Sequence, residues 1–197
     1  MKHSFSFDKA YYDCFYGERR PRREDEKETA LLGDFVCAYL RYLGQPVRTV
    51  LDIGCGMGLW RAVIAKHFPH ARYRGVEFSR YLCSKHGWTH GSVVDFQARS
   101  PFDLVICNDT LQYLSSADAA AAIDNLARLS RSALLFGVLT REDWEENCDP
   151  ARTDGDVYLR SGAWYRRRLG RHFTNLGGGL FLRHDAPAVI WELEKLR

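Results

Sequence analysis

The sequence lacks the features that would place it at a membrane or outside the cell. No apolar run approaches the roughly 18 residues that a membrane-spanning helix needs. Met1–Asp8 contains no apolar signal core followed by small residues. We therefore expect a cytoplasmic protein with no membrane partner. The chain also has no internal repeat and no low-complexity tract.

Metal-binding pairs and a strong charge imbalance are missing too. The six cysteines are widely spaced and form no C-x-x-C pair, so we expect no metal site: Cys14, Cys37, Cys55, Cys83, Cys107 and Cys148. Several lie in apolar runs, where a free thiol behaves as a small hydrophobic group, which predicts reduced, structural cysteines. The formal net charge of +3 is too small to indicate a nucleic-acid partner by itself.

What the chain does contain is the composition of one folded domain. It has 197 residues, of which 46% are apolar and 27% charged, and this length suits a single domain with a sizeable core. We divide the domain into an N-terminal arm (1–28), a core (29–140) and a C-terminal segment (141–197). The arm is rich in aromatic and charged residues, whereas the core carries the regular pattern.

Strands and helices alternate through the core. Apolar positions spaced by three and four predict a helix over Asp25–Leu43, and short apolar runs predict the five strands that follow: Val47–Ile53, Tyr73–Glu77, Trp88–His90, Phe102–Cys107 and Ala133–Leu139. Continuous apolar runs are typical of strands covered on both faces, and therefore of a parallel sheet between helices.

The C-terminal segment changes character. Ser161 is predicted to cap a helix that reaches Phe173, and Leu180–Arg183 and Ala188–Leu193 are predicted to be two strands joined by a turn at 184–187. The sequence thus predicts a doubly wound α/β fold. Its mostly parallel, seven-stranded sheet carries helices on both faces and ends in an antiparallel hairpin.

The most informative segment is Asp52–Gly58, which reads Asp-Ile-Gly-Cys-Gly-Met-Gly between a predicted strand and an amphipathic helix. Glycines let the backbone turn sharply and approach a ligand, and the following helix N-terminus suits a carboxylate or another anion. A dinucleotide fingerprint, G-x-G-x-x-G, requires glycine at position 59, which is Leu59 here. An NAD-dependent oxidoreductase is therefore a distant alternative.

A second acid supports a nucleoside site. Glu77 ends the second predicted strand, about 20 residues beyond the glycines, where a carboxylate can accept hydrogen bonds from both ribose hydroxyls. Phe78 follows and is placed to lie against an adenine face. Because dinucleotide-binding enzymes also carry an acid at this position, Glu77 does not show which nucleoside cofactor binds.

With an acid two residues before the first glycine, Asp52–Gly58 resembles the first motif of the class I (Rossmann-like) S-adenosylmethionine-dependent methyltransferases. The resemblance spans about Thr49–Leu139 and implies S-adenosylmethionine as cofactor and S-adenosylhomocysteine as product. It implies that the loop holds the methionine part, with Asp52 near its ammonium group or a bound water. The cofactor-binding residues implied are Tyr16, Asp52, Gly54, Cys55, Gly56, Met57, Gly58, Glu77, Phe78, Ser92, Val93, Asn108 and Asp109.

Two later segments extend the resemblance. Gly91–Asp95 corresponds to the segment that contacts the adenine in this family. Many members carry an acid where this chain has Ser92. We therefore expect the adenine amino group to meet Ser92 or backbone atoms, with Asp95 as the nearest alternative acid. Phe102–Leu114 is similar to the fourth motif, with Asn108 beside the expected sulfonium.

The catalytic residue stays open at this point. Many small-molecule members carry histidine where this chain has Gln112, which cannot act as a general base near neutral pH. A base is needed only if the nucleophile must lose a proton, because methyl transfer mainly requires an acceptor held in line and shielded from water. Asp109 is the candidate base, with capping of the following turn as its alternative role. The substrate residues we expect are Tyr12, Tyr113, Arg152, Tyr158 and Trp164.

Three kinds of function are compatible with these motifs. We favour a small-molecule acceptor, since the chain has neither D-P-P-Y nor N-P-P-Y and reads Asn-Asp-Thr-Leu from position 108. An RNA or protein methyltransferase is the alternative, because Arg19–Arg23 and Arg166–Arg168 could contact phosphates; acidic residues after the first run offset it. A non-catalytic S-adenosylmethionine-binding module is the third. The acceptor atom and the oligomeric state do not follow from the sequence.

Overall fold

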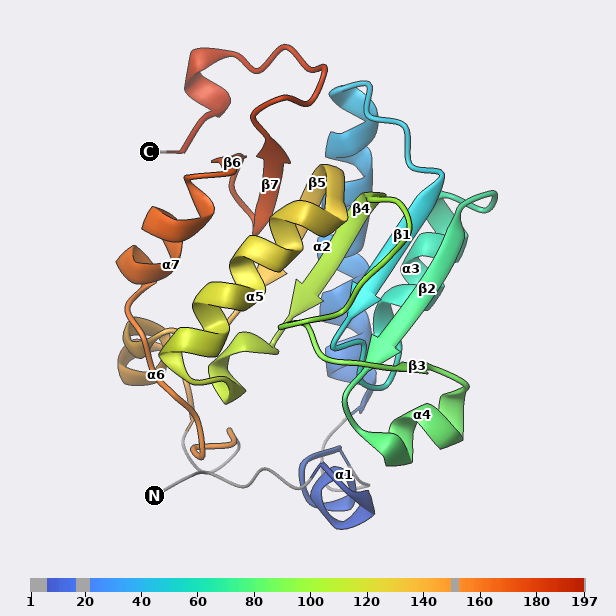
Figure 1. The fold of residues 1–197 in the computed structure, drawn as a ribbon, viewed down its shortest axis with the longest axis vertical. Coiled ribbons are helices and arrows are strands. Elements are labelled where there is room, and N and C mark those ends of the chain that lie inside the picture. The colour runs from blue at the N-terminus through green and yellow to red at the C-terminus, as the bar shows by residue number, and fades with distance from the viewer. Residues whose placement is uncertain (1–6, 17–21, 150–152, 197) are drawn as a thin grey trace.

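The computed structural model describes residues 7–16, 22–149 and 153–196. Its centre is one seven-stranded sheet with the strand order β3-β2-β1-β4-β5-β7-β6 (Figure 1). The strands are β1 (Thr49–Ile53), β2 (Arg72–Glu77), β3 (Thr89–His90), β4 (Phe102–Asn108), β5 (Ser130–Gly137), β6 (Phe173–Asn175) and β7 (Leu180–Arg183). All pairs among β1 to β5 are parallel, and β7 pairs antiparallel with both β5 and β6. The predicted fold class is confirmed.

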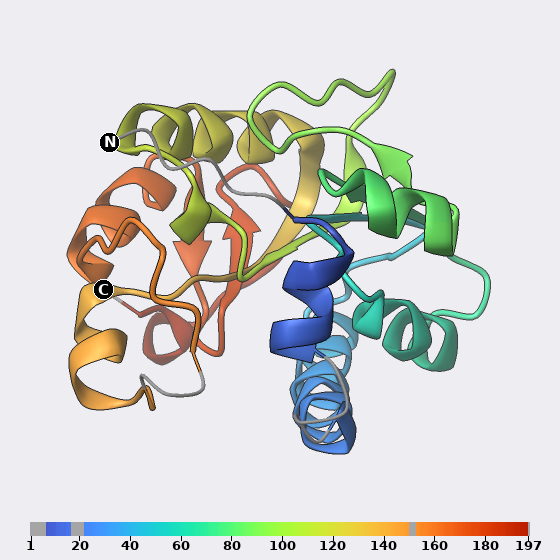
Figure 2. The same cartoon turned by 90° about the horizontal axis from the view of Figure 1, so that it is seen from below.

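Helices cover both faces of this sheet (Figures 1 and 2). The helices of the described ranges are α1 (Lys9–Tyr16), α2 (Arg22–Tyr42), α3 (Leu59–His67), α4 (Arg80–His86), α5 (Ser116–Leu129), α6 (Arg141–Glu146) and α7 (Gly162–Leu169), with 3-10 turns at Leu111–Tyr113 and Glu192–Glu194. None of the helices in the described ranges is long and apolar enough to cross a membrane.

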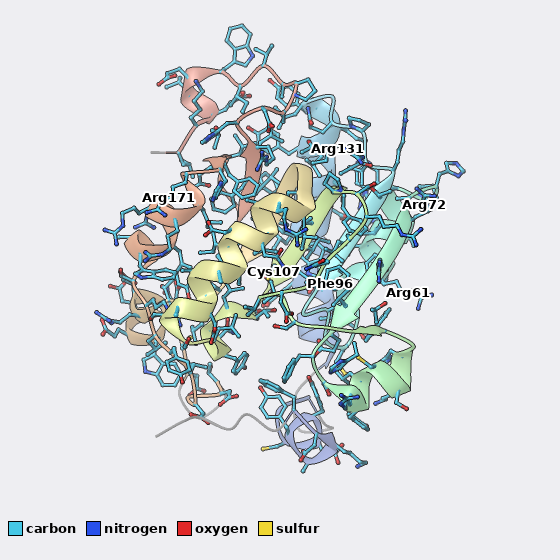
Figure 3. The ribbon with its side chains drawn as sticks, viewed as in Figure 1. Arg61, Arg72, Phe96, Cys107, Arg131 and Arg171 are labelled. Atoms are coloured by element: carbon cyan, nitrogen blue, oxygen red, sulfur yellow. The ribbon has the colours of Figure 1, made fainter. Side chains whose placement is uncertain are left out.

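Two apolar clusters fix the helices to the sheet. Successive residues of a strand point to opposite faces, so Leu51 of β1 joins the cluster under α5 and α7, and its neighbour Val50 joins the one under α2 and α3. Both side chains are fully buried. Cys107 of β4 is buried behind α5, whereas Arg72 and Arg171 lie toward the periphery (Figure 3). The cysteine thus behaves as the small core residue that the sequence predicts.

The C-terminal hairpin exists, but one of its predicted strands is wrong. The hairpin is β6–β7, so Phe173 begins a strand rather than ending a helix, and Ala188–Leu193 forms no strand. Three glycines, Gly177–Gly179, all have positive φ and make the turn between β6 and β7. A Cβ on Gly179 would approach the Phe136 carbonyl oxygen to 2.9 Å, so these glycines form a tight turn packed on β5, not a break in the chain.

The parallel strands end at one edge of the sheet. Figure 1 shows α1 beyond the carboxyl ends of β1 and β2, and Figure 2 shows it in front of that edge. In open α/β sheets this edge is where ligands bind.

Candidate active site

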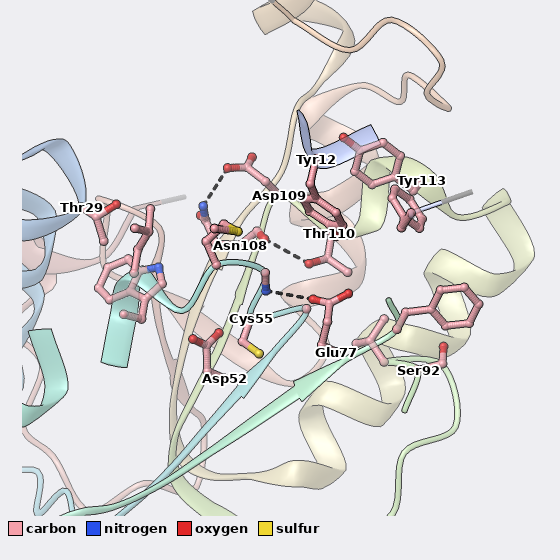
Figure 4. A pocket seen from close by; sticks show the side chains of 18 of the residues that line it. Tyr12, Thr29, Asp52, Cys55, Glu77, Ser92, Asn108, Asp109, Thr110 and Tyr113 are labelled. Atoms are coloured by element: carbon pink, nitrogen blue, oxygen red, sulfur yellow. Dashed lines mark hydrogen bonds between the residues drawn. The ribbon is translucent and has the colours of Figure 1, made fainter. Parts of the chain in front are cut away.

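A cavity of about 830 Å³ opens at the carboxyl ends of β1, β2 and β4 (Figure 4). This volume falls in the range of small-molecule and cofactor sites. Its wall is formed by Phe7, Tyr11, Tyr12, Glu28, Thr29, Leu32, Asp52, Gly54, Cys55, Gly56, Met57, Leu59, Trp60, Glu77, Phe78, Gly91, Ser92, Val93, Asn108, Asp109, Thr110, Tyr113 and Leu114.

The loop after β1 takes the conformation that its glycines predict. Gly54, Gly56 and Gly58 have φ angles of 76°, 49° and 78°, which side-chain-bearing residues rarely adopt. A Cβ on Gly54 would also overlap the Thr110 hydroxyl, whereas a Cβ on Gly56 would meet no atom within 4 Å. Gly54 is therefore required by packing between two loops, and Gly56 leaves open space on the cavity side.

Trp88 supports this loop from behind. Its indole N–H donates to the Gly56 carbonyl oxygen at 3.0 Å, and its ring lies 2.6 Å from the point where a Cβ on either Gly58 or Gly75 would be. Gly58 does not line the cavity. Its role in the structure is to make room for this indole ring.

The loop leads into α3, whose N-terminus is open. Gly58 precedes the helix and provides no side-chain cap, while Leu59 and Trp60 line the cavity. The first N–H groups of a helix lack partners within the helix and carry a partial positive charge. This end of the cavity therefore suits a carboxylate.

Asp52, the acid of the glycine motif, is buried at the cavity wall. Only 2% of its surface is exposed, and it accepts a hydrogen bond from the Tyr73 hydroxyl. Burial raises the pKa of the Asp52 carboxyl to about 7, and the negative charge of Glu77 acts in the same direction; the bond from Tyr73 opposes both. A cationic group placed beside Asp52 would favour its ionised form.

Glu77 ties the glycine loop to the end of β2. Its Oε2 accepts from the Gly56 N–H and its Oε1 accepts from the Ser79 N–H, both at 2.8 Å. Each carboxylate oxygen can accept more than one hydrogen bond. The side chain is thus fixed in orientation and retains capacity for two donors such as ribose hydroxyls. Phe78, next to it, is 56% exposed and stacks on His90 with 6.0 Å between ring centroids.

The loop after β3 forms another part of the cavity wall. Ser92 and Val93 line the cavity, whereas Asp95 is exposed and outside the wall. The Asn125 side chain donates to the Val93 carbonyl oxygen at 2.9 Å and holds this loop on α5. The Ser92 hydroxyl accepts from the Val94 N–H at 3.2 Å.

Asn108 and Asp109 end β4 beside the glycine loop. The Asn108 Nδ2 donates to Asp109 Oδ2 at 2.8 Å, and the Asp109 N–H donates to the Gly137 carbonyl oxygen at 3.0 Å. Asp109 has a φ of 50° and is the only residue other than glycine with positive φ in the described part of the chain. A side chain on Gly137 would overlap Asn108 Oδ1. The absence of a side chain at this glycine therefore makes room for Asn108.

The N-terminal arm covers part of the cavity beside Tyr113. The Ser79 hydroxyl donates to the Phe7 carbonyl oxygen at 2.5 Å, which anchors the start of the arm beside β2. Tyr11 reaches the other side, where its hydroxyl lies 3.0 Å from the Tyr113 hydroxyl and donates to Asp154 Oδ2 at 3.0 Å. Segments far apart in the sequence therefore share one wall.

The cavity brings together most of the site residues predicted from the sequence. Of the described cofactor candidates, all but Gly58 line it, as do Tyr12 and Tyr113 among the substrate candidates. The side chain of Tyr16 and the whole of Arg152 lie outside the described residues.

Two substrate candidates lie away from this wall. Trp164 packs between Tyr165, with 4.9 Å between ring centroids, and the Arg168 guanidinium, 3.7 Å from its ring. Tyr158 uses its backbone N–H to bind the Gln112 carbonyl oxygen at 2.7 Å. Gln112 itself is buried and outside the wall. Through this bond Tyr158 supports the loop after β4.

Several wall residues were not singled out from the sequence. They are Glu28, Thr29 and Leu32 of α2, Leu59 and Trp60 of α3, and Phe7, Thr110 and Leu114 in loops. Leu59 and Trp60 follow the glycine loop, so their position is a signal that could have been used. The contribution of α2 depends on how a distant helix packs, and the sequence gives no local signal for it.

Comparison with known proteins agrees with this geometry. Residues 51–132 match the family described as a methyltransferase domain. The chain is 26% identical over 148 residues to trans-aconitate 2-methyltransferase of Azoarcus sp. (strain BH72), covering 65% of this chain and 58% of that protein. It is 33% identical over 85 residues to tRNA1(Val) (adenine(37)-N6)-methyltransferase of Vibrio cholerae, covering 36% and 35%. The chain thus spans only part of the length of these curated relatives.

A solved structure shares the fold over nearly the whole chain. Magnesium protoporphyrin IX methyltransferase from Synechocystis PCC 6803, crystallised with bound SAH, superimposes with a TM-score of 0.64. The two chains are 19% identical, and the match covers 90% of this chain and 96% of that one. At this identity the likeness concerns the fold.

Proposed function

We propose that this chain, which belongs to the class I (Rossmann-like) S-adenosylmethionine-dependent methyltransferases, transfers a methyl group from S-adenosylmethionine to a small-molecule acceptor. One observation carries the proposal: Asp52, the loop residues Gly54–Met57 and Glu77 line a single cavity at the carboxyl ends of the strands, and Glu77 binds the loop through the Gly56 N–H. In this proposal residues 29–140 hold the cofactor. The arm and residues 141–197 provide the acceptor side.

The residues present fit this cofactor. The uncapped N-terminus of α3 suits the carboxylate of its methionine part. Asp52 suits the ammonium group, since a cation beside a buried carboxylate compensates the cost of ionising it. Glu77 is fixed by two backbone N–H groups and can accept the ribose hydroxyls. Gly56 leaves space for a close approach of the ligand.

The chain's own residues then orient the reaction. Bound S-adenosylmethionine supplies an electrophilic methyl group on a sulfonium. Asn108, held by its hydrogen bond to Asp109, lies at the strand end where the resemblance places that methyl group. The arm excludes water above it with the rings of Phe7, Tyr11 and Tyr12. Holding the acceptor in line lowers the barrier by reducing the entropic cost of the encounter, by about 7–11 kcal/mol in the best cases.

Calorimetric titration with S-adenosylmethionine, S-adenosylhomocysteine and NAD tests the proposal. We expect micromolar binding of both sulfur ligands, weakened at least about tenfold in Asp52→Ala and Glu77→Ala, and no binding of NAD. Binding of NAD in place of the sulfur ligands would contradict the proposal. So would unchanged affinity in both variants.

RNA or protein acceptors are the competing candidates, because one matched relative is named as a tRNA methyltransferase and Arg166 and Arg167 of α7 are exposed. Phosphate contacts make binding steeply dependent on salt. RNA binding that falls several-fold between 50 and 200 mM salt and is lost in Arg166→Ala/Arg167→Ala would favour this alternative. Cofactor binding with no methyl transfer to any acceptor class would favour a non-catalytic module.

A further inference from the structure

Asp52 has one hydrogen-bond donor among the described residues, the hydroxyl of Tyr73 on β2, which binds Oδ2. No described residue donates to Oδ1, yet Oδ1 is not one of the fully enclosed polar atoms that lack a partner. Because Asp52 lines the cavity (Figure 4), Oδ1 is reached from the cavity side. One oxygen is thus held by the protein, and the other is open to a ligand.

The register of β1 and β2 explains why a tyrosine reaches this carboxylate. Asp52 lies opposite Gly75, and Tyr73 is two residues before Gly75 on the same strand. Residues two apart point to the same face of a sheet. Tyr73 therefore stands diagonal to Asp52 on one face, and its long side chain spans the difference. Gly75 places no side chain between them, and the indole ring of Trp88 packs there instead.

Tyr73 is itself held in place and remains a donor. Its ring packs against that of Trp88 with 6.2 Å between centroids. Burial raises the pKa of the Tyr73 phenol far above its usual range, and the negative charge of Asp52 acts in the same direction; the positive charge of Arg61 opposes both. The phenol therefore keeps its proton near neutral pH and donates it to Asp52.

The other titratable groups around Asp52 do not share this role. Glu77 is a like charge and makes the ionisation of Asp52 less favourable. The charge of Asp52 acts on Cys55 and Cys107, but burial raises the pKa of both thiols above their usual range, so both stay neutral. Among the described residues, the hydrogen bond from Tyr73 is thus the interaction that favours the ionised carboxylate.

We propose that Tyr73 is a positioning residue for the cofactor: its hydroxyl keeps the Asp52 carboxylate ionised and turned so that Oδ1 meets the ammonium group of the methionine part. The inference rests on the methyltransferase function proposed above and gives a role to a residue outside the cavity wall. Without the hydroxyl, Asp52 would have no donor among the described residues and would bind a proton more readily. A neutral acid attracts the ammonium group less strongly than a carboxylate does.

Tyr73→Phe removes only the hydroxyl, and two ligands test whether its effect passes through Asp52. S-adenosylhomocysteine carries the ammonium group, whereas 5′-methylthioadenosine keeps the nucleoside and the sulfur but has neither ammonium nor carboxylate. In calorimetric titrations at pH 7, we expect the variant to bind S-adenosylhomocysteine about fivefold more weakly. Its affinity for 5′-methylthioadenosine should change less than about twofold. In an Asp52→Asn background, Tyr73→Phe should change the affinity for S-adenosylhomocysteine less than about twofold.

The loss in Tyr73→Phe should also depend on pH. The pKa of Asp52 is about 7, and loss of the hydrogen bond should raise it by about 1. The ratio of the affinities of the unaltered protein and the variant should then be about tenfold at pH 6 and about twofold at pH 8, because most of the carboxylate is ionised at the higher pH. The ligand's own amino group titrates in both experiments and cancels from the ratio.

Tyr165→Phe is the matched control, because Tyr165 is a buried phenol that accepts a hydrogen bond from Arg160 at 2.8 Å and does not line the cavity. It should change the affinity for S-adenosylhomocysteine less than about twofold at either pH. Unchanged affinity in Tyr73→Phe, an equal loss for both ligands, a loss independent of pH, or the same loss in the Asp52→Asn background would overturn the inference. Failure of S-adenosylhomocysteine to bind the unaltered protein would instead overturn the proposed function, so the two failures are distinct.

Discussion

The two halves of the cavity are built in different ways. On the proposed cofactor side, the loop from Asp52 to Gly58 is held by backbone conformation and by fixed partners such as Glu77 and Trp88. On the proposed acceptor side, side chains of distant segments are joined, as in the bond from Tyr11 to Asp154, 143 positions along the chain. A backbone-built site tolerates few substitutions, whereas a wall of side chains can change its specificity without changing the fold.

The largest effect is expected at Gly54. In Gly54→Ala the new methyl group would overlap the Thr110 hydroxyl and the residue would need a φ of 76°, so the loop must shift and affinity for S-adenosylhomocysteine should fall at least about 100-fold. Calorimetric titration measures this affinity. Gly44→Ala is the matched control: its φ is 66° and its Cβ would meet no atom within 4 Å. It should lose about 1 kcal/mol of stability and keep its affinity.

Asp52→Asn should weaken binding by about tenfold to 30-fold at pH 7.5, because it removes the negative charge that faces the ligand's ammonium group. Equal affinity of Asp52→Asn and the unaltered protein would show that Asp52 does not meet a cation. This outcome would contradict the proposed pairing of Asp52 with the ammonium group of the cofactor.

The raised pKa of Asp52 predicts a pH dependence of opposite sign for stability and for binding. Because the folded-state pKa of about 7 lies above the ordinary aspartate value of 3.8, the folded protein binds the extra proton between these values, and its stability should decrease as pH rises from about 4 to about 7. Binding needs the ionised form, so affinity should increase over about pH 5.5–7, before the ligand's own amino group titrates near 8. Asp52→Asn should flatten both profiles in thermal melts and titrations.

Trp88→Phe should have a smaller effect of about threefold to tenfold on cofactor affinity. The substitution removes the hydrogen bond to the Gly56 carbonyl oxygen and part of the ring that fills the space beside Gly58. Trp144→Phe is a suitable control, since Trp144 packs against Gly155 and does not line the cavity. A similar loss of affinity in both variants would indicate a general loss of structure instead of a loop effect.

The smallest effect on cofactor binding is expected for Tyr11→Phe. It removes the hydroxyl that joins Tyr113 to Asp154, which should lower stability by about 1 kcal/mol and change S-adenosylhomocysteine affinity less than about threefold. Tyr39→Phe, on α2 and outside the cavity, controls for loss of a phenol hydroxyl. A large loss of cofactor affinity in Tyr11→Phe alone would show that the two halves are coupled.

The same contrast explains what the sequence could predict. Asp52, Gly54 and Glu77 lie at or just after strand ends, so local pattern was enough to predict that they meet in one cavity. The joint use of Phe7, Glu28 and Thr110 in one wall depends on tertiary packing, which no local pattern encodes. Arg160 is another example: it is buried, and its guanidinium donates to the Leu111 and Tyr158 carbonyl oxygens, joining segments that are separate in the sequence.

The fold was predicted well where apolar runs were continuous and less well near the C-terminus. Strands β1, β4 and β5 follow from their runs of buried residues. At the hairpin, Ala188 and Ile190 have the apolar pattern of a strand, but they pack as partly buried residues on the cluster under α2. The edge position next to β7 is taken by the short strand that begins at Phe173. Burial without strand pairing gives the same sequence pattern as a strand.

A crystal structure of the protein grown with S-adenosylhomocysteine tests the central claim most directly. The account predicts the ligand in the cavity at the ends of β1, β2 and β4, with its ribose hydroxyls on Glu77, its ammonium group beside Asp52 and its carboxylate at the N-terminus of α3. A ligand bound elsewhere, or one in this cavity that contacts neither carboxylate, would contradict it.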